Sequence, residues 1–441
     1  MTTVAKSPDQ LREENERRLR EIVEKTGKTP AELYAERETR IRDAIELRQP
    51  DRAPVIMAGS YFAARYAGLT ASSVYYDPAA YKEAVKKTAL DFEPDLIRGA
   101  AGASAGSALA ILDAKQTAWP GGTLPPDVTH QFIEGEYMKG DEYDLFLADP
   151  TDFTLRYYLP RTLGAAAPLA QLPPVMGMAG YGLTGIIEVF LRPEFREMGE
   201  KLVAAAREQE KWRQVMSTLE EEMAAIGFPQ LLGGAGVGGS PFDAISDFYR
   251  GMRGSMLDMY RRPEKLLAAC DKILEMRLAR GVPVDPTKAR GPQLAFMPLH
   301  RGAESFMSRS QFEKFYWPSL KRTIVAATDL GYVAMPFFEG HFGDRLEYLL
   351  ELPKGKVVCH FEHTDMARAK AVLGGHLCIM GNVPSSILQI GSPREVEEYC
   401  KNLIEACGEG GGFILTHGSS IDEAKPANVK AMVDSVKKYG W

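Results

Sequence analysis

The chain has 441 residues, of which 45% are hydrophobic and 25% are charged, and its net charge at pH 7 is −6. This composition is typical of a soluble globular protein. The acidic balance argues against a nucleic-acid partner or an anionic membrane surface, because both favour basic patches. No apolar run approaches the ~20 residues that span a bilayer, and the charged N-terminus does not resemble a signal peptide. We therefore predict a cytoplasmic protein with no nucleic-acid or membrane partner.

The cysteines exclude two kinds of structural site. Their number is odd and their spacing does not suggest a disulfide framework, so we expect reduced thiols. No CxxC pair occurs, which leaves a four-thiolate zinc site without support. The five residues are Cys270, Cys359, Cys378, Cys400 and Cys407.

The first 50 residues have the pattern of a helical extension. Ser7-Pro8 and Thr29-Pro30-Ala31-Glu32 are helix-start signals, and Pro50 ends the second helix. Both helices are densely charged, which indicates a solvated face or an oligomer contact rather than a catalytic role.

From residue 51 onward, short apolar runs alternate with helix patterns. This alternation predicts parallel strands joined by helices. Eight such strands in a chain of this length are the number expected for a (β/α)8 TIM barrel, which we assign to residues 51–441. The runs are 53–58, 95–98, 229–232, 293–299, 332–338, 356–361, 376–380 and 412–416.

A long insertion follows the second strand, at residues 99–228. It contains glycine, alanine and serine runs, several prolines, and a charged helix pattern from Pro193 to Ala225. Insertions at the C-terminal side of barrel strands often form lids, so we expect a lid here. The segment Gly234–Gly239 matches GxGxxG, but it is a low-complexity glycine run followed by Ser-Pro, which favours a glycine-rich loop over a dinucleotide site.

Histidines gather at the predicted strand ends. Six of the seven histidines follow residue 299, and five of those lie at or near the C-terminal end of a strand: His300, His341, His360, His363 and His417. Functional groups of a barrel converge at this end. Glu339 and His341 are two residues apart and face the same side of an extended chain, so a carboxylate and two imidazoles from neighbouring strands could meet and bind zinc.

Two of the histidines also have structural interpretations. His376 begins a strand at the opposite end of the barrel and is expected to be a surface or packing residue. His360 lies inside a strand, where a core histidine bonded to the backbone and a site residue are equally good interpretations.

Several segments together resemble the uroporphyrinogen decarboxylase superfamily. The resemblance extends from about residue 36 over most of the chain. It implies a (β/α)8 barrel with one of two activities, which are cofactor-free decarboxylation of a porphyrinogen and zinc-dependent methyl transfer to or from a corrinoid protein. The segments are Pro50–Pro54, Pro241–Asp243, Arg250-Gly251, Met256–Met259, Arg262–Lys265, Ser305–Pro318, Gly381–Pro384 and Pro426–Met432.

The chain departs from both branches of this superfamily. Decarboxylases resemble one another in an arginine-rich segment after the first strand, whereas Met57–Tyr66 contains only Arg65. The methyltransferase branch has an HxC pair and a later cysteine as zinc ligands. Here Glu339 and His341 lie near the first position, and His417-Gly-Ser419 occupies the second, with Ser419 nearest the family cysteine. Zinc on Glu, His and His keeps a net positive charge, which suits polarisation of an ether or hydroxyl oxygen.

The sequence hypothesis is therefore a corrinoid-dependent methyltransferase that demethylates a small methoxylated compound. Glu339, His341 and His417 would bind zinc, and Glu362, His363 and Asp344 would orient ligands or handle protons. The methyl acceptor would be a corrinoid (cobalamin), carried by a partner protein or bound transiently, and the resemblance implies a homodimer. A metal-free lyase that acts by acid-base chemistry on a carboxylated substrate is the alternative, and a non-catalytic binding protein is the third.

Overall fold

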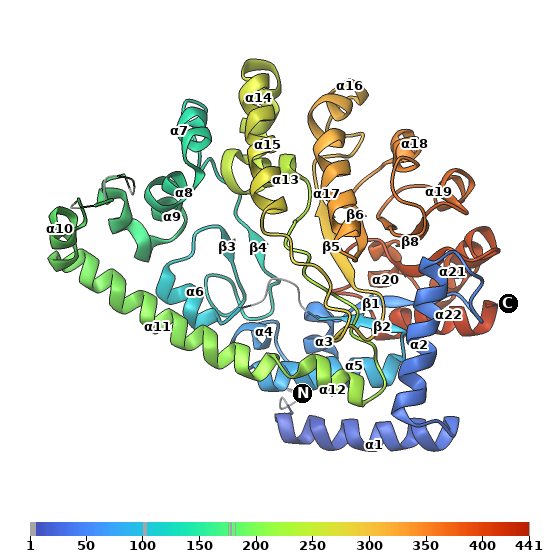
Figure 1. The fold of residues 1–441 in the computed structure, drawn as a ribbon. Coiled ribbons are helices and arrows are strands. Elements are labelled where there is room, and N and C mark those ends of the chain that lie inside the picture. Colours follow the sequence, from blue (N-terminus) through green and yellow to red (C-terminus); the bar gives the residue numbers. More distant parts are fainter. Residues whose placement is uncertain (1–5, 100–103, 175, 177–178, 181, 441) are drawn as a thin grey trace.

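The computed structural model describes residues 6–99, 104–174, 176, 179–180 and 182–440 (Figure 1). It begins with two helices, α1 (Pro8–Thr26) and α2 (Pro30–Ile45). Both start with the expected capping box, in which Ser7 and Thr29 accept a backbone N–H while a Gln or Glu side chain bonds back to the cap. Within the described residues, no helix is both long and apolar enough to cross a membrane.

The barrel strands form at the predicted places in the sequence. The third predicted strand is an extended segment at 229–232 that touches β5 through a bridge at Leu232. The others are β1 (Ile56–Ala58), β2 (Leu96–Arg98), β5 (Leu294–Leu299), β6 (Val333–Phe338), β7 (Val358–Phe361), β8 (Cys378–Val383) and β9 (Phe413–His417).

The pairing of these strands follows the order of a (β/α)8 barrel. One sheet has the order β5-β6-β7-β8-β9 and a second pairs β1 with β2, all in parallel. A bridge between Val55 and Leu415 places β1 beside β9, and the Leu232 bridge places the 229–232 segment beside β5. Within the described part of the chain, only the pairing between β2 and 229–232 that would complete the ring is not formed.

The N-terminal end of the barrel is closed by an apolar layer. Ile41, Ala44 and Ile45 of α2 pack against inward-facing residues of the strands, among them Leu96 and Met335. The charged helix α1 lies against α5 (Pro78–Phe92), where Asn15 donates to Glu83. These helices therefore pack on the barrel, whereas the homodimer stays a prediction.

Helices connect the strands and form the insertion. Between β1 and β2 lie α3 (Ser60–Tyr66), α4 (Ser73–Tyr76) and α5. The insertion contains α6 (Gly106–Leu112), β3 (Thr117–Ala118), β4 (Gln131–Phe132), α7 (Tyr143–Ala148), α8 (Pro150–Phe153), η1 (Thr154–Tyr158), α9 (Leu159–Thr162), η2 (Gly164–Gln171), α10 (Gly182–Ile186), η4 (Ile187–Leu191), α11 (Pro193–Met216) and α12 (Leu219–Ala225). The later units contain α13 (Pro241–Ala244), η5 (Ile245–Arg250), α14 (Gly251–Arg261), α15 (Pro263–Leu278), α16 (Arg309–Gln311), η6 (Phe312–Tyr316), α17 (Trp317–Asp329), η7 (Gly343–Arg345), α18 (Leu346–Leu349), α19 (Met366–Leu373), α20 (Ser385–Gln389), α21 (Pro393–Cys407) and α22 (Pro426–Tyr439).

The insertion extends away from the C-terminal units. Figure 1 shows α7 to α10 on the side of the molecule opposite α19 and α21, and α11 runs back from them toward the barrel. The charged helix predicted from Pro193 to Ala225 forms, with a break at residues 217–218. One part of the insertion reaches the functional end of the barrel, because Glu134 binds Arg301 at the end of β5. Whether the insertion closes as a lid stays a prediction.

Candidate active site

Strand register places a row of side chains on the inner face of the barrel. Pro298 pairs with Phe337, and Phe337 pairs with His360. Pro298 is exposed although its strand has a neighbour on each side, so solvent reaches this face. Because side chains alternate along a strand, the residues two positions further on point the same way. They are His300, Glu339 and Glu362.

Two aspartates reach the same place from the helical segment that follows the 229–232 strand. Asp243 lies on α13, whose start is capped by Ser240, and Asp247 lies one turn later on η5. The η5 segment is a π-helix, a conformation that is rare and frequently found at functional sites. Tyr316, which also contacts Asp243, ends a second π-helical segment, η6.

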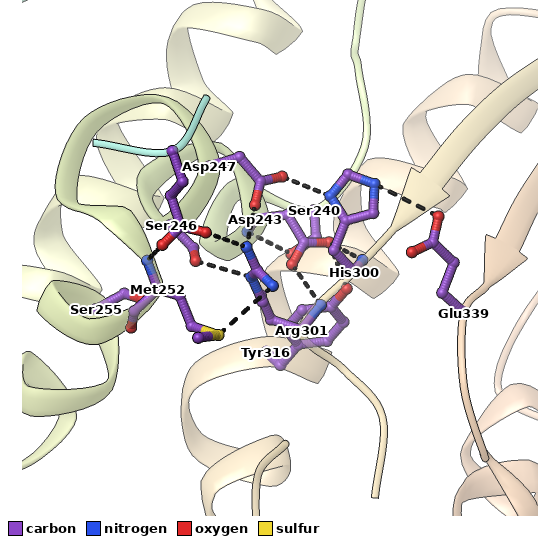
Figure 2. A network of polar contacts seen from close by, with 11 residues as sticks. Ser240, Asp243, Ser246, Asp247, Met252, Ser255, His300, Arg301, Tyr316 and Glu339 are labelled. Carbon is purple, nitrogen blue, oxygen red and sulfur yellow. Dashed lines mark hydrogen bonds and ion pairs between the residues drawn. The ribbon is translucent and has the colours of Figure 1, made fainter. Parts of the chain in front are cut away.

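His300 is held between two carboxylates (Figure 2). Its Nδ1 lies 2.6 Å from Asp247, and its Nε2 lies 3.6 Å from Glu339. Burial disfavours the charged imidazolium, but the hydrogen bond and charge of Asp247 and the charges of Glu339 and Asp243 outweigh it and raise the pKa of His300 to about 9. His300 is therefore a cation at neutral pH, with Nδ1–H bonded to Asp247 and Nε2–H beyond hydrogen-bond distance of Glu339.

Asp243 fixes the backbone at the end of β5. Its carboxylate accepts the N–H groups of His300 and Arg301, each at 3.0 Å, and the hydroxyl of Tyr316 at 2.6 Å. Burial raises the pKa of Asp243 to about 6, against the opposing hydrogen bond from Tyr316. This residue positions the site, because its oxygens are already occupied by protein donors.

Arg301 neutralises part of the acidic cluster. Its guanidinium donates to Asp247 at 3.1 Å and to Ser246 at 3.0 Å, and it forms an ion pair with Glu134 of the insertion. Arg301 thus binds the carboxylate oxygen of Asp247 that His300 does not bind (Figure 2).

Glu339 and Glu362 form the other wall. Burial and the charge of Glu362 raise the pKa of Glu339 above its ordinary value, although His300 opposes this change. Glu362 accepts the N–H of Gly340 at 2.7 Å and lies 3.5 Å from His363. His341 and His363 stack with ring centres 5.5 Å apart. The structure thus brings Glu339, Glu362, His341 and His363 to one end of the barrel.

His417 lies deeper and is fully engaged by the backbone. Its Nε2 accepts the N–H of Ala58 at 3.0 Å, and its Nδ1–H donates to the carbonyl of Ser419. Burial, with the charge of Arg98, lowers the pKa of His417 to about 3, so the ring is neutral. His360 donates from Nε2 to the His417 carbonyl and is buried, as in its core interpretation.

The zinc ligand set therefore does not fit this arrangement. Both ring nitrogens of His417 are committed to the backbone, so neither has a lone pair free for a metal ion. Among the residues that the structure describes, no three His, Cys, Asp or Glu side chains converge as a metal site. We therefore derive no step through zinc.

The remaining predicted residues lie outside this cluster. Asp344 is 73% exposed on η7, near Arg368, and its backbone N–H donates to Glu304. His376 donates to the Leu352 carbonyl at the other end of the barrel, as expected of a packing residue. A cavity of about 790 Å³ also lies at that end, beside Gln293 and Tyr332, away from the face that serves chemistry in such barrels.

Sequence reasoning missed half of the site. The sequence pattern places His300 at a strand end without giving it a role, and it does not select Asp243, Asp247 or Arg301 as site residues. The available signal was the strand-end rule that selected Glu339, since His300-Arg301 directly follows β5. The signal for Asp243 and Asp247 is weaker: the two carboxylates are four residues apart and so share one face of a helix.

Comparison with known proteins identifies the class of this protein. Residues 196–439 match the family model for uroporphyrinogen decarboxylase (URO-D). The chain is 27% identical over 235 residues to the uroporphyrinogen decarboxylase of Anaeromyxobacter dehalogenans, covering 52% of this chain and 62% of that protein. It is 30% identical over 77 residues to that of Idiomarina loihiensis, covering 17% and 21%. The chain thus spans less than two thirds of these relatives.

A solved structure extends the likeness of the fold. The methyltransferase from Methanosarcina mazei aligns with a TM-score of 0.58 at 14% identity, over 91% of this chain and 98% of that one. The family match covers more than half of the sequence. The chain belongs to the uroporphyrinogen decarboxylase family, with a (β/α)8 barrel fold.

Proposed function

We propose that this protein is a methyltransferase that removes the methyl group of a small O-methylated compound. The acceptor would be the cobalt(I) centre of a corrinoid held by a partner protein. The observation that supports this proposal best is the His300 imidazolium, which is held between Asp247 and Glu339 at the open end of the barrel.

The reaction needs a proton at the leaving oxygen. The acceptor supplies the electron pair of the new cobalt–carbon bond, and the pair of the broken carbon–oxygen bond stays on oxygen. His300 would donate its Nε2 proton to that oxygen, while Asp247 holds Nδ1–H and fixes the ring. A pKa of about 9 is close to that of a phenol, about 10, so proton transfer to a departing phenoxide is well matched.

The charge of the site argues against a porphyrinogen with many carboxylates. Glu339, Glu362 and Asp247 surround the position that such a substrate would occupy. Arg65, the one arginine of the segment after β1, already donates to the carbonyls of Asp422 and Asp127. The names of the decarboxylase relatives are therefore not sufficient to assign their substrate to this chain.

An apolar rim beside the site supports a protein partner. Met252, which contacts Arg301, and Phe248, next to Asp247, are each 43% exposed. Phe132 packs edge-on against Phe248 and is 46% exposed. A large methyl acceptor that approaches His300 from the open end would cover these side chains.

A metal-free carboxy-lyase is the second candidate. The same imidazolium could protonate the carbanion left when carbon dioxide departs, and the curated relatives carry the decarboxylase name. This reaction would release carbon dioxide and would not need cobalt(I).

A direct assay distinguishes the two candidates. The purified protein is incubated with 4-methoxybenzoate or methoxybenzene and chemically reduced cobalamin, and methylcobalamin is followed by absorbance while carbon dioxide is measured in parallel. We expect methylcobalamin to form, with a His300→Gln variant about 10²- to 10⁴-fold slower. The control is His376→Gln, which alters a histidine at the other end of the barrel. Carbon dioxide without methylcobalamin would favour the lyase instead.

A further inference from the structure

One cation on the inner face of the barrel, Arg98, has no counter-ion among the residues that the structure describes. Arg98 ends β2, two residues after the inward-facing Leu96, and its guanidinium lies 4.8 Å from the ring centre of Phe296 on β5. It forms no ion pair with any described residue, and the undescribed residues include no Asp or Glu. Its Nε atom is buried without a hydrogen-bond partner.

A partly buried guanidinium whose Nε–H is buried without an acceptor is costly. Buried charges in proteins are normally paired, and a buried donor without an acceptor loses its solvation without compensation. Burial lowers the pKa of Arg98 to about 10, which leaves it charged at neutral pH. The charge also reaches its neighbours, since it contributes to the lowered pKa values of His360 and His417.

The surroundings of Arg98 are flat and aromatic. Phe296 and Phe337 stack with ring centres 6.2 Å apart, and Phe337 stacks on His360 at 4.3 Å. Phe296 is partly exposed, and Pro298, which lies two residues nearer the open end on β5, is exposed. A planar apolar body could therefore lie along this wall with its anionic end on the guanidinium.

The charges along the barrel are ordered by depth. Arg98 contacts Phe296, which pairs with Met335 of β6, whereas Glu339 lies four residues beyond Met335 toward the open end. A ligand with one negative charge would be attracted at the deep end, and a second charge near the rim would be repelled. This order favours a monocarboxylate over a polycarboxylate or a dianionic phosphate.

We propose that Arg98 is the carboxylate-binding residue of this site, and that the substrate is an aromatic monocarboxylate with its carboxylate held by the guanidinium. Two parallel N–H···O bonds are the preferred geometry of this pair. The inference deepens the proposed function, on which it rests for the identity of the reacting group. With the carboxylate at Arg98, a methoxy group at the far end of the ring would point toward His300 and the open end.

Ligand binding tests this proposal without any methyl transfer. Titration calorimetry at pH 7.5 would use benzoate, 4-methoxybenzoate, methoxybenzene and inorganic phosphate. We expect the two carboxylates to bind the wild type, and both to bind Arg98→Gln at least about 30-fold more weakly. Arg98→Lys should be intermediate, because lysine keeps the charge but loses the paired geometry. Arg322→Gln makes the same chemical change on the exposed face of α17 and should bind like the wild type.

Thermal unfolding separates this role from a structural one. Removing a partly buried charge that has no counter-ion among the described residues should leave the melting temperature of Arg98→Gln unchanged or higher. The proposal is overturned if Arg98→Gln and the wild type bind benzoate equally, or if the wild type prefers phosphate or binds neither carboxylate. A melting temperature of Arg98→Gln that is lower by several degrees would also overturn it. Arg98-dependent benzoate binding without methyl transfer would support carboxylate binding by Arg98 and reject the proposed function. Methyl transfer from 4-methoxybenzoate that Arg98→Gln does not change would do the reverse.

Discussion

The short strand β2 and the residue before it carry two charges three residues apart, the buried Asp95 and the partly buried Arg98, and their surroundings differ completely. Asp95, at the closed end of the barrel, accepts from Arg40 at 2.5 Å, from Arg52 at 2.8 Å and from the backbone of Val55 at 2.8 Å. Arg98, three residues further along the strand toward the open end, has no carboxylate partner within the described residues. The closed end is thus built for stability, whereas the open end keeps charges that a ligand or a proton transfer can use.

The largest expected effect is on stability, at the closed end. Burial alone would raise the pKa of Asp95, but the charges of Arg52 and Arg40 hold it below its ordinary value. Asp95→Ala leaves two arginines without their shared partner, and we expect it to cost about 3–5 kcal/mol of unfolding free energy in urea denaturation. Asp51→Ala removes an exposed partner of Arg40 and, after solvent screening, should cost less than about 1 kcal/mol.

The pH dependence sharpens the same prediction. Because the pKa of Asp95 is lowered in the folded state, its contribution is present above the unfolded value near 3.9 and is lost as the pH falls through the folded value. The stability difference between the wild type and Asp95→Ala should therefore narrow below about pH 4. Equal stabilities at pH 7 would contradict the structural role of this residue.

A smaller effect is expected at the open end, where Asp247 supports the charge of His300. The rate of methyl transfer should fall as the pH rises through about 9, because the proton donor is lost. In Asp247→Asn the pH at which the rate falls should be lower by about one to two units. Asp344→Asn, which alters the exposed aspartate on η7, should leave the profile unchanged. A shift in the Asp344 variant, or none in the Asp247 variant, would reassign the supporting carboxylate.

The smallest expected effect is that of metal removal. Both nitrogens of His417 are hydrogen bonded to the backbone, so a chelator should change the methyl-transfer rate by less than about twofold. Elemental mass spectrometry would measure the zinc content of the wild type and of His417→Ala. One zinc per chain that is lost in the variant, with a rate that falls on chelation, would show that His417 turns toward a metal ion.

Periodicity was sufficient to predict the barrel but only part of the site. The apolar runs predict strands such as β6 and β9, and the capping signals predict the helix starts at Ser7 and Thr29, because both signals are local. The strand-end rule also placed Glu339 and Glu362 correctly at the open end. These features depend on neighbours within a few residues.

The rest of the site depends on contacts between distant segments. His300 and Asp247 are 53 residues apart, and no local pattern shows that they meet at 2.6 Å. Nor could the sequence show that the chain turns after β9 and places the Ser419 carbonyl against Nδ1 of His417. This hydrogen bond removes His417 from metal binding. A histidine at a strand end is a ligand, an acid or a core residue according to which groups its two nitrogens face.

The pKa of His300 is the most direct test of this account. Histidine ring signals of isotope-labelled protein would be followed by NMR from pH 5 to 10, and the His300 signal would be assigned by its loss in His300→Gln. The account predicts one titration near pH 9 that is absent in the variant. A His300 signal that titrates near the ordinary value of about 6.5 would contradict it, because the ring would then be neutral at pH 7.5 and could not serve as the acid.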